Sequence, residues 1–230
     1  MYILAIIPAR SKSKGVKNKN IKKINNKELL YFTIRRAKQS KLITNIIGST
    51  DSKIYEKVFK KYSIWTPKLR PKKLSGDKSN IIKTLIYKLK IAEELKKKTY
   101  DYVVLLQPTS PFRKKNEIDV AIKKLIKSKC DSLISLCELQ GVHPIKMKRI
   151  DKKLVKNFIP KSPENPPRQS LQKLYVPSGN LYIVKRNILL KNRSLIGKKQ
   201  TFAIINKDRY INIDNKKDFE YAKIKLRNFK

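Results

Sequence analysis

Residues 2–20 read YILAIIPARSKSKGVKNKN, an apolar run that changes at Pro8 into a loop of small and basic residues. A short apolar run bounded by such a loop predicts a buried strand. The loop carries Arg10, Lys14 and Lys19. Fixed cations and small residues at the carboxyl end of a first strand are how α/β proteins hold a polyphosphate. The spacing fits neither the P-loop nor the dinucleotide fingerprint, so the loop predicts another kind of nucleotide site or, alternatively, a solvated basic loop.

Short apolar runs alternate with longer segments of helical period along the rest of the chain, which is typical of βαβ units. We expect strands at residues 2–7, 45–49, 102–106, 132–136, 180–184, 200–205 and 210–213. We expect helices at residues 27–39, 53–62, 80–95, 116–128 and 216–226. The pattern predicts a single α/β domain over residues 1–230 with a doubly wound, mostly parallel sheet.

Residues 140–177 interrupt this alternation. The segment contains six prolines, at positions 144, 160, 163, 166, 167 and 177. Prolines exclude long helices, so an extended excursion from the domain is expected here. The residues themselves leave open whether it packs against a partner or is a mobile surface loop.

Composition restricts the class of protein. The chain has 57 Lys and Arg against 17 Asp and Glu, a formal net charge of +40. The basic residues are scattered, with no recognisable motif for reading DNA or RNA, so specific nucleic-acid binding is not expected. No segment has the length of a membrane span. Cys130 and Cys137 flank one expected strand, too far apart to bridge, which fits reduced thiols and a cytoplasmic location.

Polar motifs follow several of the expected strands. Residues 105–113 read LLQPTSPFR, residues 70–77 read RPKKLSGD, and residues 143–146 read HPIK. Further on stand Arg168-Gln169 with Gly179 and Tyr182, and residues 210–214 read YINID. Side chains just beyond a strand's carboxyl end face the ligand crevice of an open α/β sheet. These motifs therefore form a candidate site, although capping of the following helices would also explain Asp77 and Asp214.

Together with the basic loop, these motifs resemble the acylneuraminate cytidylyltransferases, which make CMP-activated sialic acids and related nonulosonic acids. The resemblance covers nearly the whole chain. It implies a nucleotide-diphospho-sugar transferase fold and a homodimer in which the 140–177 excursion packs against the second subunit. The eight-carbon sugar acid Kdo is not expected as substrate, because Lys19-Asn20 and QPTSP stand where the Kdo enzymes have Gly-Lys-Pro and QGDEP.

The resemblance also implies roles for individual residues. It assigns triphosphate binding to Arg10, Ser13, Lys14 and Lys19, nucleoside binding to Asn20 and Arg70, the sugar pocket to Gln107, Lys146, Arg168 and Tyr182, and Mg²⁺ to Asp214 with Asn212. Arg10, Lys14, Lys19 and Asp214 are the catalytic candidates. His143 is expected to have a structural or interface role.

Three positions depart from the family pattern. Asn212 replaces an Asp of the metal motif, Ser178 replaces an Asn before Gly179, and Lys12 replaces a Gly of the basic loop. An amide oxygen is still a possible Mg²⁺ ligand, but one negative charge is lost. The Ser178 change is expected to alter the sugar pocket.

The expected reaction is an in-line attack on the α-phosphorus of CTP by the anomeric hydroxyl of a nine-carbon 2-keto sugar acid. It yields the CMP-sugar and pyrophosphate. Either a metal-bound hydroxide or Asp214 could deprotonate the hydroxyl. Legionaminate and pseudaminate are alternatives to N-acetylneuraminate as the sugar. An alternative of another class is a catalytically weakened nucleotide- or nucleic-acid-binding protein on the same fold.

Overall fold

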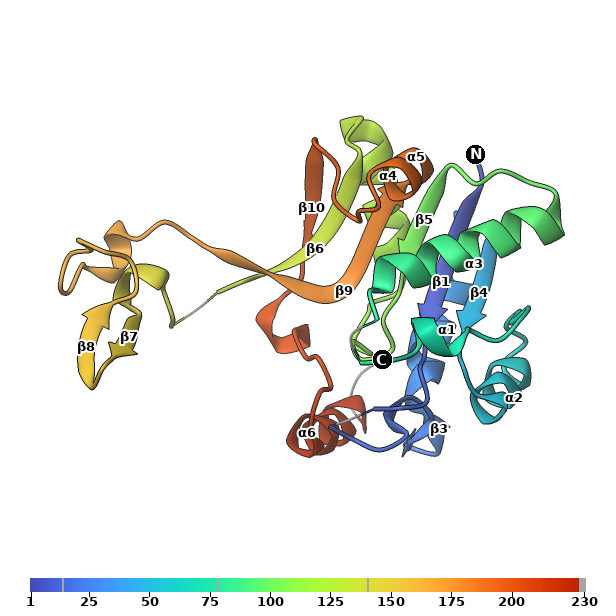
Figure 1. Ribbon diagram of the computed structural model, residues 1–230, viewed down its shortest axis with the longest axis horizontal. Helices are drawn as coiled ribbons and strands as arrows, with labels where there is room; N and C mark the ends of the chain where they lie inside the picture. The colour runs from blue at the N-terminus through green and yellow to red at the C-terminus, as the bar shows by residue number, and fades with distance from the viewer. Residues whose placement is uncertain (14, 78, 140, 228–230) are drawn as a thin grey trace.

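A computed structural model describes residues 1–13, 15–77, 79–139 and 141–227. The chain forms an α/β body from which a long arm projects, shown at the left of Figure 1. Lys14, one of the expected phosphate-binding residues, lies outside the described residues. No helix among the described residues is long and apolar enough to cross a bilayer.

The body is built on a six-stranded sheet with the order β10-β6-β9-β5-β1-β4. Its strands are β1 (Ile3–Pro8), β4 (Asn45–Ser49), β5 (Tyr102–Leu105), β6 (Ser132–Glu138), β9 (Tyr175–Lys185) and β10 (Gln200–Ile204). β4, β1 and β5 run parallel, as do β10 and β6, whereas β9 is antiparallel to both β5 and β6. The expectation of a mostly parallel sheet is confirmed, with the strand that returns from the arm as the exception.

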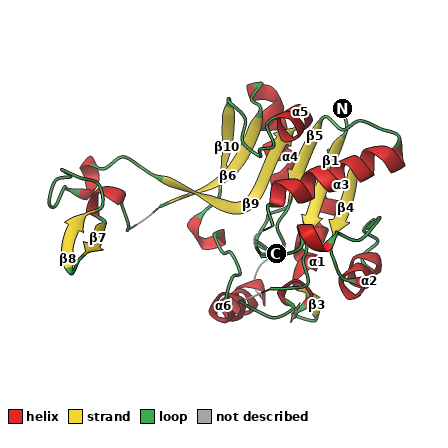
Figure 2. Ribbon diagram, in the orientation of Figure 1, coloured by secondary structure: helices red, strands yellow, loops and turns green. Residues whose placement is uncertain are grey.

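Helices cover both faces of this sheet (Figure 2). α1 (Leu29–Lys38), α2 (Lys53–Lys61) and α4 (Glu117–Ser128) pack with Ile3, Ala5 and Ile7 of β1. α3 (Ile81–Lys96) and α5 (Arg186–Lys191) pack with Leu4 and Ile6 of the same strand. A strand covered on both faces must be apolar at every position, which explains the unbroken run at residues 2–7. The fold is therefore doubly wound.

A third, smaller core lies below the carboxyl ends of the strands. α6 (Lys216–Arg227) contributes Phe219 and Ala222, and the basic loop contributes Val16. The short hairpin of β2 (Lys23–Ile24) and β3 (Lys27–Glu28) adds Ile24 to this cluster. This core attaches the basic loop and the segment before α6 to one another, although they are far apart in sequence.

Most expected elements are confirmed to within a few residues, but the strand expected at 210–213 is wrong. Residues 210–214 have no strand pairing; Ile213 N donates a single backbone hydrogen bond to Thr109 O at 2.9 Å. The alternating side chains in this segment fit an irregular connection with Ile213 buried. The helix α5 was not expected from the sequence, and six residues are too few for a clear helical period.

The arm corresponds to the proline-rich excursion. β6 and β9 extend into it, and a separate hairpin, β7 (Lys148–Asp151) with β8 (Leu154–Asn157), lies at its far end (Figure 1). Large apolar side chains are exposed on this hairpin and beyond it, with Ile150 at 82%, Val155 at 69% and Phe158 at 57% exposure. The arm thus has an apolar surface that its own chain leaves uncovered.

Candidate functional site

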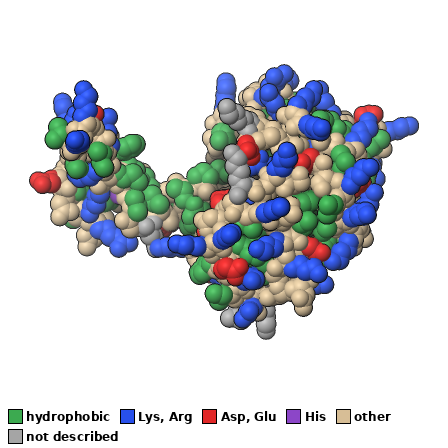
Figure 3. All heavy atoms as spheres, turned by 60° about the horizontal axis from the view of Figure 1, so that its bottom comes forward, with side chains coloured by type: hydrophobic (Ala, Val, Ile, Leu, Met, Phe, Trp, Pro, Cys, Tyr) green, Lys and Arg blue, Asp and Glu red, His purple; other side chains and the backbone are tan. Residues whose placement is uncertain are grey.

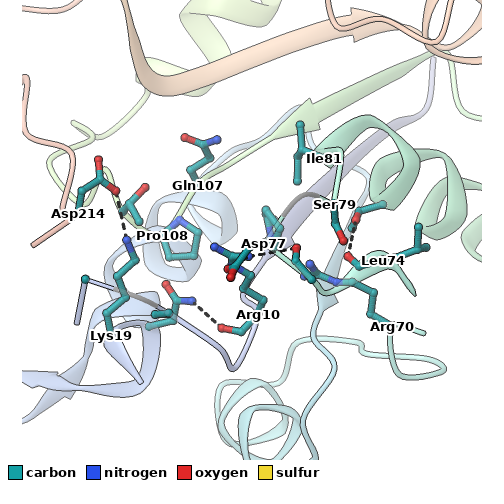
Figure 4. Close-up of a pocket in the computed structure, with 17 residues that line it drawn as sticks. Arg10, Lys19, Arg70, Leu74, Asp77, Ser79, Ile81, Gln107, Pro108 and Asp214 are labelled. Carbon is teal, nitrogen blue, oxygen red and sulfur yellow. Dashed lines mark hydrogen bonds and ion pairs between the residues drawn. The ribbon is translucent and has the colours of Figure 1, made fainter. Parts of the chain in front are cut away.

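A cavity of about 430 Å³ opens at the carboxyl ends of β1 and β5 (Figure 4). The parallel pairing of β1 with both β4 and β5 brings the loops that follow these three strands to one edge of the sheet. Seven of the expected site residues line the cavity: Arg10, Ser13, Lys19, Asn20, Arg70, Gln107 and Asp214. These residues are separated by up to two hundred positions in the chain, so the fold assembles them.

The basic loop is attached to the body near its start, at Ser11. Ser11 donates from its backbone N and its Oγ to the two carboxylate oxygens of Asp51, at 2.8 and 2.7 Å. Asp51 lies two residues after the end of β4, so a neighbouring strand end holds the start of the loop. Farther along, Asn20 Nδ2 donates to Arg10 O at 3.4 Å. The start of the loop is therefore bound to the end of a neighbouring strand, and its far end is bound back to Arg10.

Arg10, which belongs to the basic loop, contacts the loop that follows Arg70. Its Nη1 donates to Asp77 Oδ1 at 3.0 Å and to Gly76 O at 3.2 Å (Figure 4). The Arg10 side chain is about one-third exposed, at 35%. A guanidinium in this position can exchange one oxygen partner for another without leaving the cavity, which suits the binding of an anionic ligand.

Arg70 is buried, with only 6% exposure. Its Nη2 donates to Ser49 O at 2.5 Å, and its backbone N donates to Thr50 O at 2.7 Å. Burial lowers the pKa of Arg70 to about 10, and Asp51 acts in the opposite direction. Its buried Nε has no hydrogen-bond partner among the described residues. An unpartnered buried donor is costly, and Arg70 is one of the residues that line the cavity.

A buried arginine supports the position of Gln107. Arg113 donates to Gln107 O at 2.9 Å, to Asn180 O at 2.7 Å and to Thr33 Oγ1 at 2.8 Å. Burial lowers the pKa of Arg113 to about 9. Gly179 passes close by with a φ of +72°, and a Cβ there would lie 3.2 Å from Gln107 Oε1. The backbone of the QPTSP loop is thus fixed from beneath, while the Gln107 side chain faces the cavity.

Lys19, Asn212 and Asp214 form a polar group on the opposite side of the cavity. Lys19 Nζ donates to Ile213 O at 2.6 Å and to Asp214 Oδ1 at 3.3 Å, and Asn212 Nδ2 donates to Asp214 Oδ2 at 3.0 Å. Asp214 N and Asn215 N both donate to Asp218 Oδ2 at 2.9 Å, which fixes the backbone here. The Asp214 carboxylate itself is 66% exposed.

The donor set at Asp214 fits a magnesium ion that is shared with a ligand. The described residues contain no group of three His, Cys, Asp or Glu side chains arranged to hold a metal by themselves. Mg²⁺ is commonly held by one or two carboxylates together with substrate phosphates and water. Asp214 supplies one carboxylate at the cavity edge, and the Asn212 amide lies beside it.

Three of the four expected sugar-pocket residues lie elsewhere. Lys146 and Arg168 line a second cavity, of about 550 Å³, on the arm, together with His143. Tyr182 is half-buried within β9, where burial raises its pKa. Only Gln107 of this set lines the first cavity. Within one chain, then, the expected sugar-binding residues do not come together.

The substitution at Ser178 does not reach the first cavity. Ser178 is buried between β6 and β9, where its Oγ donates to Ser135 Oγ at 2.7 Å. Ser135 in turn donates to Leu181 O at 3.0 Å. The serine belongs to a hydrogen-bonded pair inside the sheet and does not line the first cavity, and the expectation that this substitution alters the sugar pocket stays a prediction.

Sequence reasoning missed three residues that shape the cavity: Asp51, Arg113 and Gly15. A Cβ on Gly15 would lie 1.7 Å from Asp214 O, so only glycine allows the basic loop to lie against this segment. Asp51 was recognisable as a carboxylate directly after an expected strand. The role of Gly15 had no such signal, because its neighbour lies two hundred positions away.

The comparisons with known proteins identify the family of this chain. Residues 4–225 match the family model described as cytidylyltransferase. The chain is 31% identical over 230 residues to a CMP-N,N'-diacetyllegionaminic acid synthase of Campylobacter jejuni, covering 98% of this chain and 96% of that one. It is 32% identical over 223 residues to an N-acylneuraminate cytidylyltransferase of Escherichia coli, covering 96% of this chain and 51% of that longer enzyme.

Among solved structures, a CMP:2-keto-3-deoxy-manno-octonic acid synthetase complexed with CTP superposes with a TM-score of 0.71 at 13% identity, covering 99% of both chains. Identity this low supports the fold alone, whereas the family match spans almost the whole sequence. The doubly wound sheet of this chain agrees with the fold of that structure. On these grounds the chain belongs to the cytidylyltransferase family, and it is a nucleotidyltransferase.

Proposed function

We propose that this protein transfers CMP from CTP to the anomeric oxygen of a nonulosonic acid and releases pyrophosphate. The observation that carries the proposal is the cavity at the strand ends, which three cationic side chains line: Arg10, Lys19 and Arg70. Relatives that match along most of this chain are named for the synthesis of CMP-legionaminic acid and for N-acylneuraminate cytidylyl transfer. A cationic cavity of this size suits a nucleoside triphosphate.

In the proposed reaction the anomeric oxygen forms a bond to the α-phosphorus, and the bond from that phosphorus to the bridging oxygen of pyrophosphate breaks. The proton of the anomeric hydroxyl passes to a base, for which Asp214 is the candidate among the protein's own residues. Such transfers need little covalent chemistry from the protein, so positioning and charge neutralisation dominate. Arg10 and Lys19, with Ser13 and Lys14, bind the triphosphate and stabilise the leaving pyrophosphate. Asn20 and Arg70 bind the nucleoside, and Gln107 orients the acceptor sugar.

Magnesium fits this proposal as a cofactor. Asp214 is the protein ligand, and the Asn212 oxygen becomes a second one only if its amide turns away from its present contact with Asp214 Oδ2. When bound, the ion neutralises charge on the phosphates as it develops on the leaving group. Lys19 holds Asp214 at the cavity edge from 3.3 Å and so keeps the carboxylate oriented toward the ligand.

We also propose that the protein acts as a homodimer in which the arm completes the partner's site. The arm carries Lys146 and Arg168 away from the cavity of their own chain (Figure 1). The arm also exposes apolar residues such as Ile150 and Val155. Covering them with the surface of a second copy removes their apolar area from water and so stabilises a dimer. A sugar acid needs a cation for its carboxylate, and an arginine fork in the neighbouring copy supplies it.

The sugar is a nine-carbon 2-keto acid in this proposal, with legionaminate, pseudaminate and N-acetylneuraminate as the candidates. The two free thiols, Cys130 and Cys137, are consistent with a cytoplasmic enzyme. Nucleic-acid binding is not proposed: the basic side chains are dispersed over the body and the arm in the view of Figure 3, without the single stripe that tracks a phosphate backbone.

The function is tested by pyrophosphate release from CTP in the presence of each of the three sugar acids, with ATP, GTP and UTP as controls. We expect release that requires both CTP and one of the acids. Arg10→Ala should lower the rate by on the order of a hundredfold, because it removes a charge that acts on the leaving phosphates. Tight binding of nucleic acid at physiological salt without any CTP turnover would refute the proposal.

The shared site is tested by mixing two inactive variants, Arg10→Ala and Arg168→Ala. In a heterodimer one of the two sites then has an intact Arg10 and an intact Arg168. Random reassortment of equal amounts should restore about a quarter of the wild-type rate per protomer. No recovery, with heterodimers demonstrated by a tag on one variant, would place both arginines in the same chain's site.

A further inference from the structure

Helix α3 contains a lysine that is almost completely buried. Lys88 is 1% exposed, and it lies on the face of the helix that packs against the body, next to Leu89 and Leu85. Burial lowers the pKa of Lys88 to about 8, with further lowering from Arg70 and a smaller opposing effect of Glu56. An apolar side chain would avoid this cost, so the contacts of the Lys88 ammonium need an explanation.

The contacts of Lys88 are with the backbone of one loop. Its Nζ donates to Pro67 O at 2.8 Å and to Lys68 O at 2.5 Å. The neighbouring residue on the helix, Tyr87, donates from its hydroxyl to Leu69 O at 3.3 Å. Two adjacent side chains of α3 thus bind three successive carbonyl groups, from residues 67 to 69.

This loop leads directly into Arg70. Lys68 has a φ of +53°, a conformation that a non-glycine residue holds only when its surroundings support it. Two residues later, the Arg70 backbone N donates to Thr50 O, and the Arg70 side chain donates to Ser49 O and lines the cavity. The carbonyls bound by α3 therefore belong to the three residues that immediately precede Arg70.

We propose that Lys88, assisted by Tyr87, is a positioning residue for nucleotide binding, which acts by holding residues 67–69 so that Arg70 reaches the cavity. The proposal rests on the nucleotide role proposed above for Arg70. Lys88 does not line the cavity, and it affects the ligand through the loop. A buried, charge-assisted pair of hydrogen bonds to backbone is well suited to fixing a loop that has no strand pairing of its own.

The test compares Lys88→Met with Arg186→Met. Methionine keeps the length of the lysine stem but has no donor. Arg186 forms an ion pair at 2.6 Å with Glu93, in the last turn of α3. Loss of this ion pair weakens the same helix and leaves the hydrogen bonds from Lys88 and Tyr87 to residues 67–69 in place. For Lys88→Met we expect a rise of about tenfold in the KM for CTP, with kcat and the KM for the sugar acid within about twofold of wild type. For Arg186→Met we expect a lower Tm and an unchanged KM for CTP.

Amide hydrogen exchange gives a second measurement that does not depend on turnover. In Lys88→Met the Arg70 amide should exchange faster, while the amides of β1 stay protected. Tyr87→Phe, which removes one hydroxyl and keeps the packing, should shift both measurements in the same direction by a smaller amount, and it serves if Lys88→Met does not fold.

The two proposals fail in different ways. If wild-type protein turns over no CTP, the proposed function is refuted, and the exchange at Arg70 still decides the role of Lys88. If Lys88→Met, or Tyr87→Phe where Lys88→Met does not fold, leaves both the exchange and the KM for CTP unchanged, the positioning role is wrong. An equal rise in the KM for CTP for Arg186→Met would also overturn it, because the effect would then be a general loss of stability.

Discussion

Replacing Gly15 by alanine should separate the basic loop from the segment that carries Asp214. An added Cβ would lie 1.7 Å from Asp214 O and 2.9 Å from the carbonyl carbon, and contacts under 3.0 Å are essentially never tolerated. The two segments must therefore part by about 1 Å or more. The Asp214 side is held by the hydrogen bond from Ile213 N to Thr109 O, so we expect the loop to move. A displacement of about 1 Å in a group that positions substrate costs on the order of a hundredfold in rate.

The assay is pyrophosphate release from CTP, read as kcat/KM, with thermal unfolding measured in parallel. Gly76→Ala is the matched control, because Gly76 lines the same cavity and a Cβ there would meet only Ser79 Oγ at 3.6 Å, an ordinary contact. We expect Gly15→Ala to lose about a hundredfold in kcat/KM, or about 2.7 kcal/mol, and Gly76→Ala to stay within a few fold of wild type. Equal activity of the two variants would refute the close contact between loop and segment.

Three further substitutions and one pH dependence test other parts of the site. Asn212→Asp should lower the Mg²⁺ concentration for half-maximal rate by about tenfold, since it restores a second carboxylate, whereas Asp214→Asn should nearly abolish turnover without unfolding the protein. An active Asp214→Asn variant with unchanged Mg²⁺ dependence would remove this segment as the metal site. Arg168→Lys should raise the KM for the sugar acid far more than the KM for CTP, because a point charge does not reproduce a bidentate contact; equal effects would place Arg168 outside the sugar pocket. The pKa of Lys88 in the fold, about 8, lies below its unfolded value of 10.5, so the unfolded chain binds the extra proton between these values. In denaturant titrations, the free energy of unfolding of the wild-type protein should therefore rise relative to that of Lys88→Met as the pH rises from 8 to 10. A difference between the two free energies that stays constant over this range would contradict the lowered pKa of Lys88.

Local patterns in the sequence were sufficient for the fold class and for the first half of the site. The alternation of apolar runs with helical segments predicted five of the six sheet strands closely and a core of the sixth, because each strand buries a continuous run and each helix buries a stripe. The polar residues directly after strands, such as Arg10 and Gln107, were predicted to face one crevice. That prediction needs only the rule that parallel strands end at the same edge of a sheet.

The segment around Asp214 shows where local pattern was misleading. Alternation at residues 210–213 resembles a strand, yet pairing depends on a neighbouring strand edge, and this segment runs below the sheet instead. Its place is set by the third core around Phe219 and Val16 and by contact with Gly15. Contacts between residues so far apart in the chain leave no periodic signal in either segment.

By itself, the sequence determined the doubly wound sheet, the position of the crevice and the family, because these depend on hydrophobic period and on motifs of a few adjacent residues. Only the tertiary structure decided that Lys146 and Arg168 lie on an arm away from the first cavity, that Ser178 is buried beside Ser135, and that Lys88 binds the carbonyls of Pro67 and Lys68. The physical reason is the same in each case. The orientation and the burial of a side chain depend on the residues that pack against it. In these cases the neighbouring residues are distant in the sequence, so only the complete fold brings them together.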